Sequence, residues 1–268
     1  MKSHPYVGIS DRVKTVAKPL LDNSGEYHLV HRARLVRTAD LLVEAVEAVG
    51  KDCRILELGT SGFLPVLLKS LFPSVTIDVT ELSEAFESIE IKRQKVVDVA
   101  GQTAEVTAFA LDLEHENIPV VKDTYDIVIC CEVLEHMEID PMFMLSEVNR
   151  VLKTDGKLLL TTPNILSSRA FTRIMDGYPP YFFMQYHKSR EYHRHNYEYS
   201  AKVLWNTLKC AGFDPDVWTE DLFEDSQPHT VDRLNYFGFN IANTGDNLIA
   251  LATKISGVVE RFPNGLYV

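Results

Sequence analysis

Three things are scarce in this chain of 268 residues: long apolar runs, cysteine and positive charge. No run approaches the apolar length of a membrane-spanning helix, and residues 1–10 lack the apolar centre of a secretory signal. We therefore expect a soluble, cytoplasmic protein without a membrane partner. The 27 Lys and Arg residues are outnumbered by 38 Asp and Glu residues, for a formal net charge of -11. Because phosphate backbones are bound by clustered positive charge, nucleic acid is not an expected partner.

The four cysteines, Cys53, Cys130, Cys131 and Cys210, follow no metal-binding spacing. Cys53 and Cys130 fall in stretches predicted to be buried strands, where a free thiol behaves as a small apolar side chain. We expect reduced cysteines and no metal site.

Apolar and polar stretches alternate as in a parallel sheet that is covered by helices on both faces. Strands are predicted at residues 54–58, 75–80, 105–111, 125–131 and 156–162, and helices at 25–49, 63–71, 83–99, 141–152 and 199–211. Two last strands, 215–220 and 247–254, can pair as an antiparallel edge. The pattern predicts one α/β domain with a doubly wound, seven-stranded, mostly parallel sheet.

Two segments interrupt this alternation. Residues 163–198 are rich in Tyr, Phe, His and Arg without a sustained period, and we interpret them as an inserted lid over a substrate. The acidic residues 221–244 form a second insertion, by their turn signals. Residues 1–50 form an N-terminal cap region around the leading helix.

The first chemical feature is the turn from Glu57 to Gly62, which follows a strand and leads directly into a helix. A glycine turn there brings backbone close to a ligand at the carboxyl edge of the sheet, although it is also an ordinary strand-to-helix connection. Glu81 ends the second strand 22 residues after Gly59 (81 − 59). Its carboxylate can accept hydrogen bonds from both hydroxyls of an adenosine ribose. Loop and acid together predict a nucleoside ligand.

Asp112 ends the third strand, where it is suitably placed for the exocyclic amine of an adenine, with Leu113 beside the ring. An acid in a surface turn is an equally good interpretation. Because Glu114 and Glu116 lie nearby, the sequence leaves open which of these acids would face the adenine.

In order and spacing, five segments resemble class I S-adenosylmethionine-dependent methyltransferases, particularly the type 11, 12 and 23 methyltransferase domains. They are ILELGTSG (55–62), TELS (80–83), YDIVICCEVLEHM (125–137), EVNRVLKTDGKLLLTTPN (147–164) and HNYEYS (195–200). The resemblance implies one Rossmann-like methyltransferase domain over residues 1–268. That family usually has glycine where Ser61 stands, and often another where Phe63 stands, so the loop is either wider than usual or shifted onto Gly62.

The resemblance also implies S-adenosyl-L-methionine as cofactor and a residue set that binds it. This set comprises Glu57, Gly59, Thr60, Ser61 and Gly62 at the methionine portion, Glu81 with Leu82 at the ribose, Asp112 and Leu113 at the adenine, and Cys131 and Glu132 on the methionine side. Tyr27, at the start of the leading helix, could meet the cofactor's carboxylate.

Two other function classes stay open at this stage. A nicotinamide-dependent oxidoreductase shares the sheet and the ribose-binding acid, but its G-x-G-x-x-G fingerprint is missing, because the glycines fall only at Gly59 and Gly62. A noncatalytic domain that binds the cofactor or a partner is the third class.

Methyl transfer to a hydroxyl is helped by a base, and histidine is the natural base near neutral pH. His136 follows the fourth strand and should face the cofactor edge, while His187, His193 and His195 lie in the predicted lid. A metal bound by the lid histidines is not expected, because no firm carboxylate partners lie nearby in the sequence.

The lid mixes aromatic rings with Lys188, Arg190 and Arg194, a combination suited to a small, anionic acceptor. We expect O-methylation of a sugar or nucleotide-linked sugar. The alternative is O- or N-methylation of another small metabolite, such as a quinone precursor. A homo-oligomer is left open.

Overall fold

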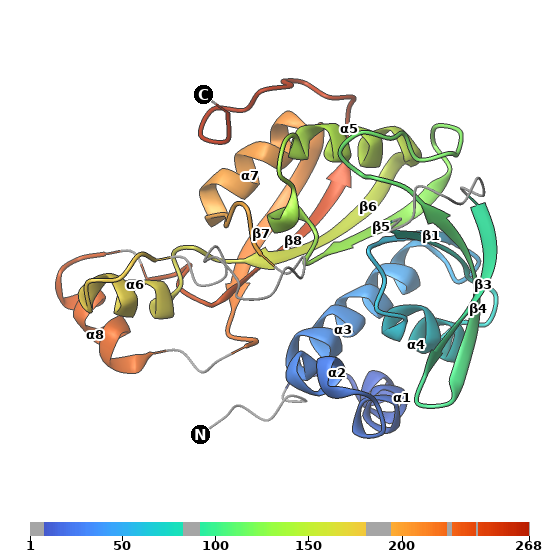
Figure 1. The fold of residues 1–268 in the computed structure, drawn as a ribbon, viewed down its shortest axis with the longest axis horizontal. Helices are drawn as coiled ribbons and strands as arrows, with labels where there is room; N and C mark the ends of the chain where they lie inside the picture. The colour runs from blue at the N-terminus through green and yellow to red at the C-terminus, as the bar shows by residue number, and fades with distance from the viewer. Residues whose placement is uncertain (1–7, 83–91, 181–193, 224–226, 240, 268) are drawn as a thin grey trace.

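The computed structural model describes residues 8–82, 92–180, 194–223, 227–239 and 241–267. Within these residues, eight strands form one sheet in the order β3-β4-β2-β1-β5-β6-β8-β7 (Figure 1). The strands are β1 (Arg54–Leu58), β2 (Thr76–Glu81), β3 (Lys92–Val99), β4 (Gln102–Ala110), β5 (Tyr125–Cys131), β6 (Leu152–Pro163), β7 (Phe213–Glu220) and β8 (Asn247–Lys254). The five central strands, β4, β2, β1, β5 and β6, pair in parallel with their neighbours. The pairs β3–β4, β6–β8 and β8–β7 are antiparallel. The mostly parallel sheet with an antiparallel C-terminal edge is confirmed.

Helices cover both faces of this sheet (Figure 1). One face packs against α1 (Asp11–Asp22), α3 (Arg32–Val49) and α4 (Phe63–Leu71), and the other against α5 (Pro141–Val151) and α7 (Ala201–Cys210). Successive strand residues point to opposite faces, so Ile55 and Leu56 of β1 lie in two different hydrophobic clusters. The central strands are therefore buried on both sides, as a doubly wound α/β fold requires.

The helix predicted over residues 83–99 is wrong for residues 92–99, which form β3; residues 83–91 lie outside the described residues. β3 pairs with β4 from Lys92 opposite Phe109 to Val99 opposite Gln102. A turn at Ala100 and Gly101, with φ of 54° and 78°, closes this hairpin. The sheet consequently has eight strands, one more than predicted.

The N-terminal region also differs from the prediction. The helix expected over residues 25–49 is split at His31 into α2 (Glu26–Val30) and α3, and α1 precedes both without having been predicted. In the part of the chain that the structure describes, no helix has the length and apolar content needed to cross a membrane.

Each of the two predicted insertions contains a helix. These are α6 (Ser168–Met175) and α8 (Pro228–Tyr236), which contact each other at one end of the molecule, apart from the helices that cover the sheet (Figure 1). The hydroxyls of Thr172 and Thr230 join them at 2.6 Å. Two segments that are distant in sequence thus form one unit, and its role as a lid stays a prediction.

Gly212, between α7 and β7, is a position where the fold requires glycine. Its φ is +91°, and an added Cβ would lie 2.4 Å from the carbonyl oxygen of Gly257 and 2.6 Å from that of Ser256. We expect Gly212→Ala to lower the free energy of unfolding by about 3 kcal/mol, through backbone strain and overlap together. Urea unfolding measures this. Gly177→Ala is the matched control, because Gly177 has a φ of +83° with nothing within 4 Å of its Cβ position; it should cost only about 1 kcal/mol. Equal losses in the two variants would contradict the steric argument.

Candidate cofactor and acceptor site

The turn after β1 is built around two glycines with positive φ. Gly59 (φ +66°) donates its N–H to Thr80 Oγ1 at 3.1 Å, and Gly62 (φ +83°) donates to Thr60 Oγ1 at 2.9 Å while preceding α4. A Cβ at position 59 would approach Val133 Cγ2 to 3.0 Å. Ser61 has no positive φ, so its backbone does not require the glycine that the family usually has there. The second positive φ of the turn therefore falls at Gly62, immediately before α4.

Glu57 lies at the carboxyl end of β1 with a side chain that is almost completely buried. Its Oε2 atom has no hydrogen-bond partner among the described residues. Burial raises the pKa of Glu57 to about 7, although a hydrogen bond with Thr60 partly opposes the rise. A buried carboxylate with an unused oxygen is the environment that a bound ammonium group would complement.

Arg34, on α3, is a candidate site residue that the sequence did not reveal. Its side chain is buried, and Nη2 donates to the hydroxyl of Tyr27 at 3.3 Å. Nε lies 4.0 Å from Glu132 Oε2 and has no hydrogen-bond partner in the described part of the chain. The signal in the sequence was a helical stripe: Arg34 is spaced with Thr38 and Leu41, which are also buried.

Glu132 follows β5 with a φ of +55°, and its carboxylate is held by neighbouring strands. Oε1 accepts hydrogen bonds from Thr161 Oγ1 at 2.8 Å and from Asn247 Nδ2 at 3.0 Å. Cys131 lies within electrostatic range of Arg34, Glu132 and Glu57, and burial raises the pKa of its thiol to about 12. The thiol of Cys131 is therefore neutral near pH 7, and its place on the methionine side of the cofactor stays a prediction.

These orphaned polar atoms fit the amino-acid end of S-adenosylmethionine. Glu57 could accept from its ammonium group, and Arg34 could donate to its carboxylate, with Tyr27 beside the guanidinium. On α2, His28 approaches the backbone of Ser61, so this short helix lies over the loop. The residues present thus match the chemistry of the group, and their individual roles stay predictions.

The ribose position differs from the expectation. The Glu81 carboxylate, at the end of β2, is paired with Arg93 Nη2 at 2.7 Å and with Lys95 Nζ, both from β3. Burial would raise the pKa of Glu81, but hydrogen bonds from Lys95 and Arg93 outweigh it and lower the pKa. The neighbouring Leu82 is exposed. A ribose would therefore have to share this carboxylate with two cations or displace them.

We expect Glu81→Ala to weaken S-adenosylhomocysteine binding by about tenfold or more, because two charge-assisted hydrogen bonds to the ribose would be lost. Arg93→Ala should strengthen binding or leave it unchanged, since it removes a competitor for the same carboxylate. Isothermal titration of both variants measures this. Unchanged affinity in Glu81→Ala would remove the residue from the cofactor site.

At the expected adenine position, Asp112 already has a structural role. Its Oδ1 accepts from the N–H of Glu114 at 2.8 Å, and Oδ2 contacts His115 Nδ1 at 2.8 Å. Leu113 packs against the hydrophobic core. Both carboxylate oxygens of Asp112 are engaged in a turn, which favours the surface-turn interpretation, and the contact with adenine stays a prediction.

On the acceptor side, the predicted base His136 ends the short 3-10 helix η1 (Leu134–His136), and the structure brings His195 against it. The ring centroids are 5.1 Å apart, in an edge-to-face arrangement. His136 Nδ1 lies 3.1 Å from the carbonyl oxygen of Arg194, and His195 Nδ1 lies 3.1 Å from Glu198 Oε1. His187 and His193 lie outside the described residues.

Glu135 is the third member of a cluster with His136 and His195. Its side chain is fully buried, Oε2 accepts from Thr162 Oγ1 at 2.9 Å, and Oε1 has no partner among the residues described. Burial, followed by the charge of Glu132, raises its pKa well above the usual value. Ligand atoms of Glu135, His136 and His195 lie within 4.8 Å of one another, so these three residues could hold a metal ion. The expectation of no metal stays a prediction.

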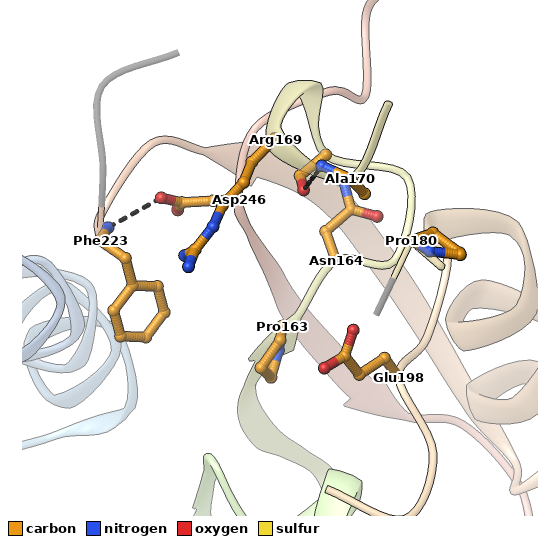
Figure 2. Close-up of a pocket in the computed structure, with 9 residues that line it drawn as sticks. Pro163, Asn164, Arg169, Ala170, Pro180, Glu198, Phe223 and Asp246 are labelled. Atoms are coloured by element: carbon orange, nitrogen blue, oxygen red, sulfur yellow. Dashed lines mark hydrogen bonds between the residues drawn. The ribbon is translucent and has the colours of Figure 1, made fainter. Parts of the chain in front are cut away.

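Glu198, the partner of His195, also lines a pocket (Figure 2). It is lined by Pro163, Asn164, Ser167, Arg169, Ala170, Pro180, Glu198, Phe223 and Asp246. Figure 2 shows the Phe223 ring and the Glu198 carboxylate on different sides, with Arg169 directed between them. The centroid of the Phe223 ring lies 5.5 Å from that of the His31 ring and 5.6 Å from Cζ of the Arg34 guanidinium. One aromatic ring therefore joins the pocket to the candidate cofactor residues.

Comparison with known proteins agrees with this geometry. Residues 28–217 match the family model described as a methyltransferase domain, which is more than half of the chain. The ubiquinone biosynthesis O-methyltransferase of Vibrio campbellii is 27% identical over 143 residues, covering 53% of this chain and 57% of that protein. The Haemophilus ducreyi protein of the same name is 28% identical over 145 residues, covering 53% and 58%. The matched regions thus span little more than half of these relatives.

Solved structures with low sequence identity share the fold. An S-adenosylmethionine-dependent methyltransferase from Archaeoglobus fulgidus has a TM-score of 0.52 at 15% identity, covering 85% of this chain and 98% of that one. Another, from Thermotoga maritima, has a TM-score of 0.51 at 19% identity, covering 90% and 99%. With a family model that matches most of the chain, a doubly wound sheet and a glycine turn at its edge, this chain belongs to the class I S-adenosylmethionine-dependent methyltransferases of the methyltransferase-domain family.

Proposed function

We propose that this methyltransferase transfers its methyl group to a hydroxyl oxygen of a small aromatic metabolite, of the kind found in quinone precursors. The observation that carries the proposal is the histidine pair, His136 and His195, held by hydrogen bonds at the sheet edge that also carries the cofactor loop. A neutral hydroxyl is a poor nucleophile until its proton is accepted by a neighbouring base. Two relatives that match this chain over 57% and 58% of their own length are named as O-methyltransferases of ubiquinone biosynthesis, which supports a phenolic acceptor.

The pocket next to these histidines is the candidate acceptor site. Phe223 offers a ring face to an aromatic acceptor, and the pocket lies between this ring and Glu198. When bound, the cofactor supplies a methyl carbon on a sulfonium sulfur. The residues of this chain would align the hydroxyl with that carbon and exclude water, which are the main demands of an in-line displacement.

A sugar hydroxyl is the second candidate acceptor. It is favoured by the polar members of the pocket lining, Asn164, Arg169 and Asp246. Amide, guanidinium and carboxylate groups in one pocket can pair with several hydroxyls, and Arg169 could also pair with an anionic substituent.

The test is transfer of an isotopically labelled methyl group from S-adenosylmethionine to two matched acceptor panels. One contains phenols and catechols with and without a carboxylate, and the other contains sugars and nucleotide sugars. We expect labelled methyl ether on a phenolic oxygen. Labelling of sugars alone would select the second candidate, and labelling only on nitrogen or carbon would overturn the proposal of O-methylation.

A further inference from the structure

The fold brings together three side chains with metal-binding atoms from two distant segments. Glu135 and His136 belong to η1, soon after β5, and His195 lies 59 residues farther along the chain (195 − 136). One carboxylate oxygen and one nitrogen from each ring lie within 4.8 Å of one another. The carboxylate that the sequence did not offer near the lid histidines is therefore supplied by a different part of the fold.

The Glu135 carboxylate is the member of this cluster that points to a ligand. Its side chain is 0% exposed, and Oε2 accepts from Thr162 Oγ1 at 2.9 Å. Oε1 has no hydrogen-bond partner among the described residues. A buried polar atom without a partner costs free energy until another group satisfies it. A cation bound by the two neighbouring histidines would satisfy this oxygen.

Both histidine rings are oriented by an outer partner on Nδ1. The Nδ1 atom of His136 lies 3.1 Å from the carbonyl oxygen of Arg194, and that of His195 lies 3.1 Å from Glu198 Oε1. Histidines that bind a metal through one ring nitrogen almost always have a carbonyl, a carboxylate or water at the other. The two rings thus have the surroundings that metal-binding histidines have.

Backbone hydrogen bonds hold the two segments next to each other. The N–H groups of Asn196 and Tyr197 donate to the carbonyl oxygen of Glu135 at 2.7 and 3.2 Å. Asn196 Nδ2 also donates to the carbonyl oxygen of His136 at 2.8 Å. The position of His195, directly before Asn196, is therefore set by the fold. Ligands that are already in place lose less conformational entropy when an ion binds.

The ligand set selects the kind of cation. Two imidazoles and one carboxylate suit zinc and neighbouring transition metals, whereas magnesium and calcium prefer oxygen ligands. Three protein ligands leave the fourth position of a tetrahedral ion open, as in catalytic zinc sites. Because a coordination bond to zinc can displace a hydrogen bond from the same nitrogen, the site does not require ring nitrogens that lack other contacts.

We propose that Glu135, His136 and His195 bind one divalent cation of the zinc type, with Glu135 Oε1 as the carboxylate ligand. Glu198 is the positioning residue that holds the ring of His195. The sequence led us to expect no metal, and the difference arises because Glu135 and His195 meet only in the folded chain. The metal site does not depend on which acceptor the enzyme uses.

The cluster shares a residue with the candidate acceptor pocket. Glu198, the partner of His195, also lines this pocket (Figure 2). An acceptor hydroxyl at the open position of the cation would have a lower pKa, so that its proton passes to water. The two histidines would then act on the hydroxyl through the cation. This consequence, unlike the metal site itself, rests on the proposed O-methylation.

The first test is isothermal titration of the chelator-treated protein with Zn²⁺ and, separately, with Mg²⁺. We expect one Zn²⁺ per chain and much weaker binding of Mg²⁺. Loss of an outer partner lowers metal affinity by roughly 10–100-fold, so Glu198→Gln should weaken Zn²⁺ binding by about tenfold. Glu135→Gln and His195→Ala, which remove ligands, should weaken it by more than about 100-fold. Tighter binding of Mg²⁺ than of Zn²⁺, or unchanged Zn²⁺ affinity in Glu135→Gln, would overturn the proposal.

His115→Ala is the matched control. His115 is an exposed histidine that also has a carboxylate partner, since its Nδ1 lies 2.8 Å from Asp112 Oδ2. This variant should bind Zn²⁺ as tightly as the wild type, and a loss confined to it would place the ion at the surface pair instead. Far-ultraviolet circular dichroism of all four variants checks that they are folded.

A second measurement uses the wild-type protein and so does not depend on the folding of any variant. Co²⁺ in place of Zn²⁺ should give visible d–d absorption bands without an intense thiolate-to-cobalt charge-transfer band, because the proposed ligands are nitrogen and oxygen. A strong charge-transfer band would place the metal at a cysteine such as Cys131 and would overturn the ligand set.

The metal site and the proposed O-methylation fail separately. Metal binding is measured without an acceptor, so a protein that binds no Zn²⁺ would overturn the metal site and leave the labelling result untouched. If labelling finds no methyl ether while Glu135→Gln loses Zn²⁺, the metal site stands and only the proposed acceptor chemistry is wrong.

Discussion

Glu57→Gln is expected to stabilise the cofactor-free protein above pH 7 and to weaken cofactor binding at the same pH. The cause is the burial of Glu57, which raises its pKa from 4.5 to about 7. Because the folded state holds the proton more tightly than the unfolded state, the free energy of unfolding falls as pH rises from about 4.5 to about 7. Over that window the loss approaches about 3 kcal/mol. Glutamine carries no charge at any pH, so the variant avoids this loss.

The measurement is urea unfolding of both proteins at pH 5 and pH 8. Other carboxylates titrate equally in the two proteins and cancel in the difference. The gap in unfolding free energy should therefore widen with pH in favour of Glu57→Gln. Parallel pH curves would show that Glu57 is ionised in the folded protein at neutral pH.

The same titration predicts how cofactor binding depends on pH. An ammonium group prefers the ionised carboxylate, so the affinity of the wild-type protein for S-adenosylhomocysteine should rise up to tenfold for each unit by which the pH increases toward about 7, and then level off. In Glu57→Gln this rise should be lost, and at pH 8 the affinity should be about 100-fold lower than wild type. Isothermal titration at pH 6 and pH 8 tests both statements. A wild-type affinity that does not change with pH would contradict them.

Arg34→Met is expected to weaken S-adenosylhomocysteine binding by about 100-fold, because the ligand's carboxylate loses a buried, charge-assisted partner. Methionine fills a similar volume without charge, and Glu132 keeps its hydrogen bonds to Thr161 and Asn247. Arg37→Met, three residues along the same helix, is the control, since Arg37 pairs with Glu220 and Asp40.

The choice of ligand separates a local effect from a general one. Methylthioadenosine has the nucleoside and the sulfur but no amino-acid end, so its affinity should change little in Arg34→Met. Equal losses for both ligands, measured by isothermal titration, would mean that the substitution disturbs the pocket as a whole. A selective loss for S-adenosylhomocysteine places the carboxylate at Arg34.

The prediction of the central fold succeeded where local sequence decides structure. The strands β1 and β5 and the central part of β6, Leu158 to Leu160, are mostly apolar because both of their faces are buried. The glycine turn after β1 needs positive φ at Gly59 and Gly62. β3 was missed because its exposed face carries charged residues, and a short strand of that kind depends on its partner, β4.

Some features of the candidate site also follow from local sequence, and others depend on tertiary contacts. The sequence by itself determined the glycine turn after β1 and the acid Glu81 at the end of β2, because strand-to-helix turns and strand ends are local features, whereas Asp112 lies beyond the end of β4. Only the tertiary structure decided that Arg93 of β3 forms an ion pair with the carboxylate of Glu81. The same holds for Arg34 facing Glu132 and for the ring of His195 packing against that of His136. In each of these pairs the residues are separated along the chain, and folding brings them together only because the hydrophobic core fixes the elements that carry them.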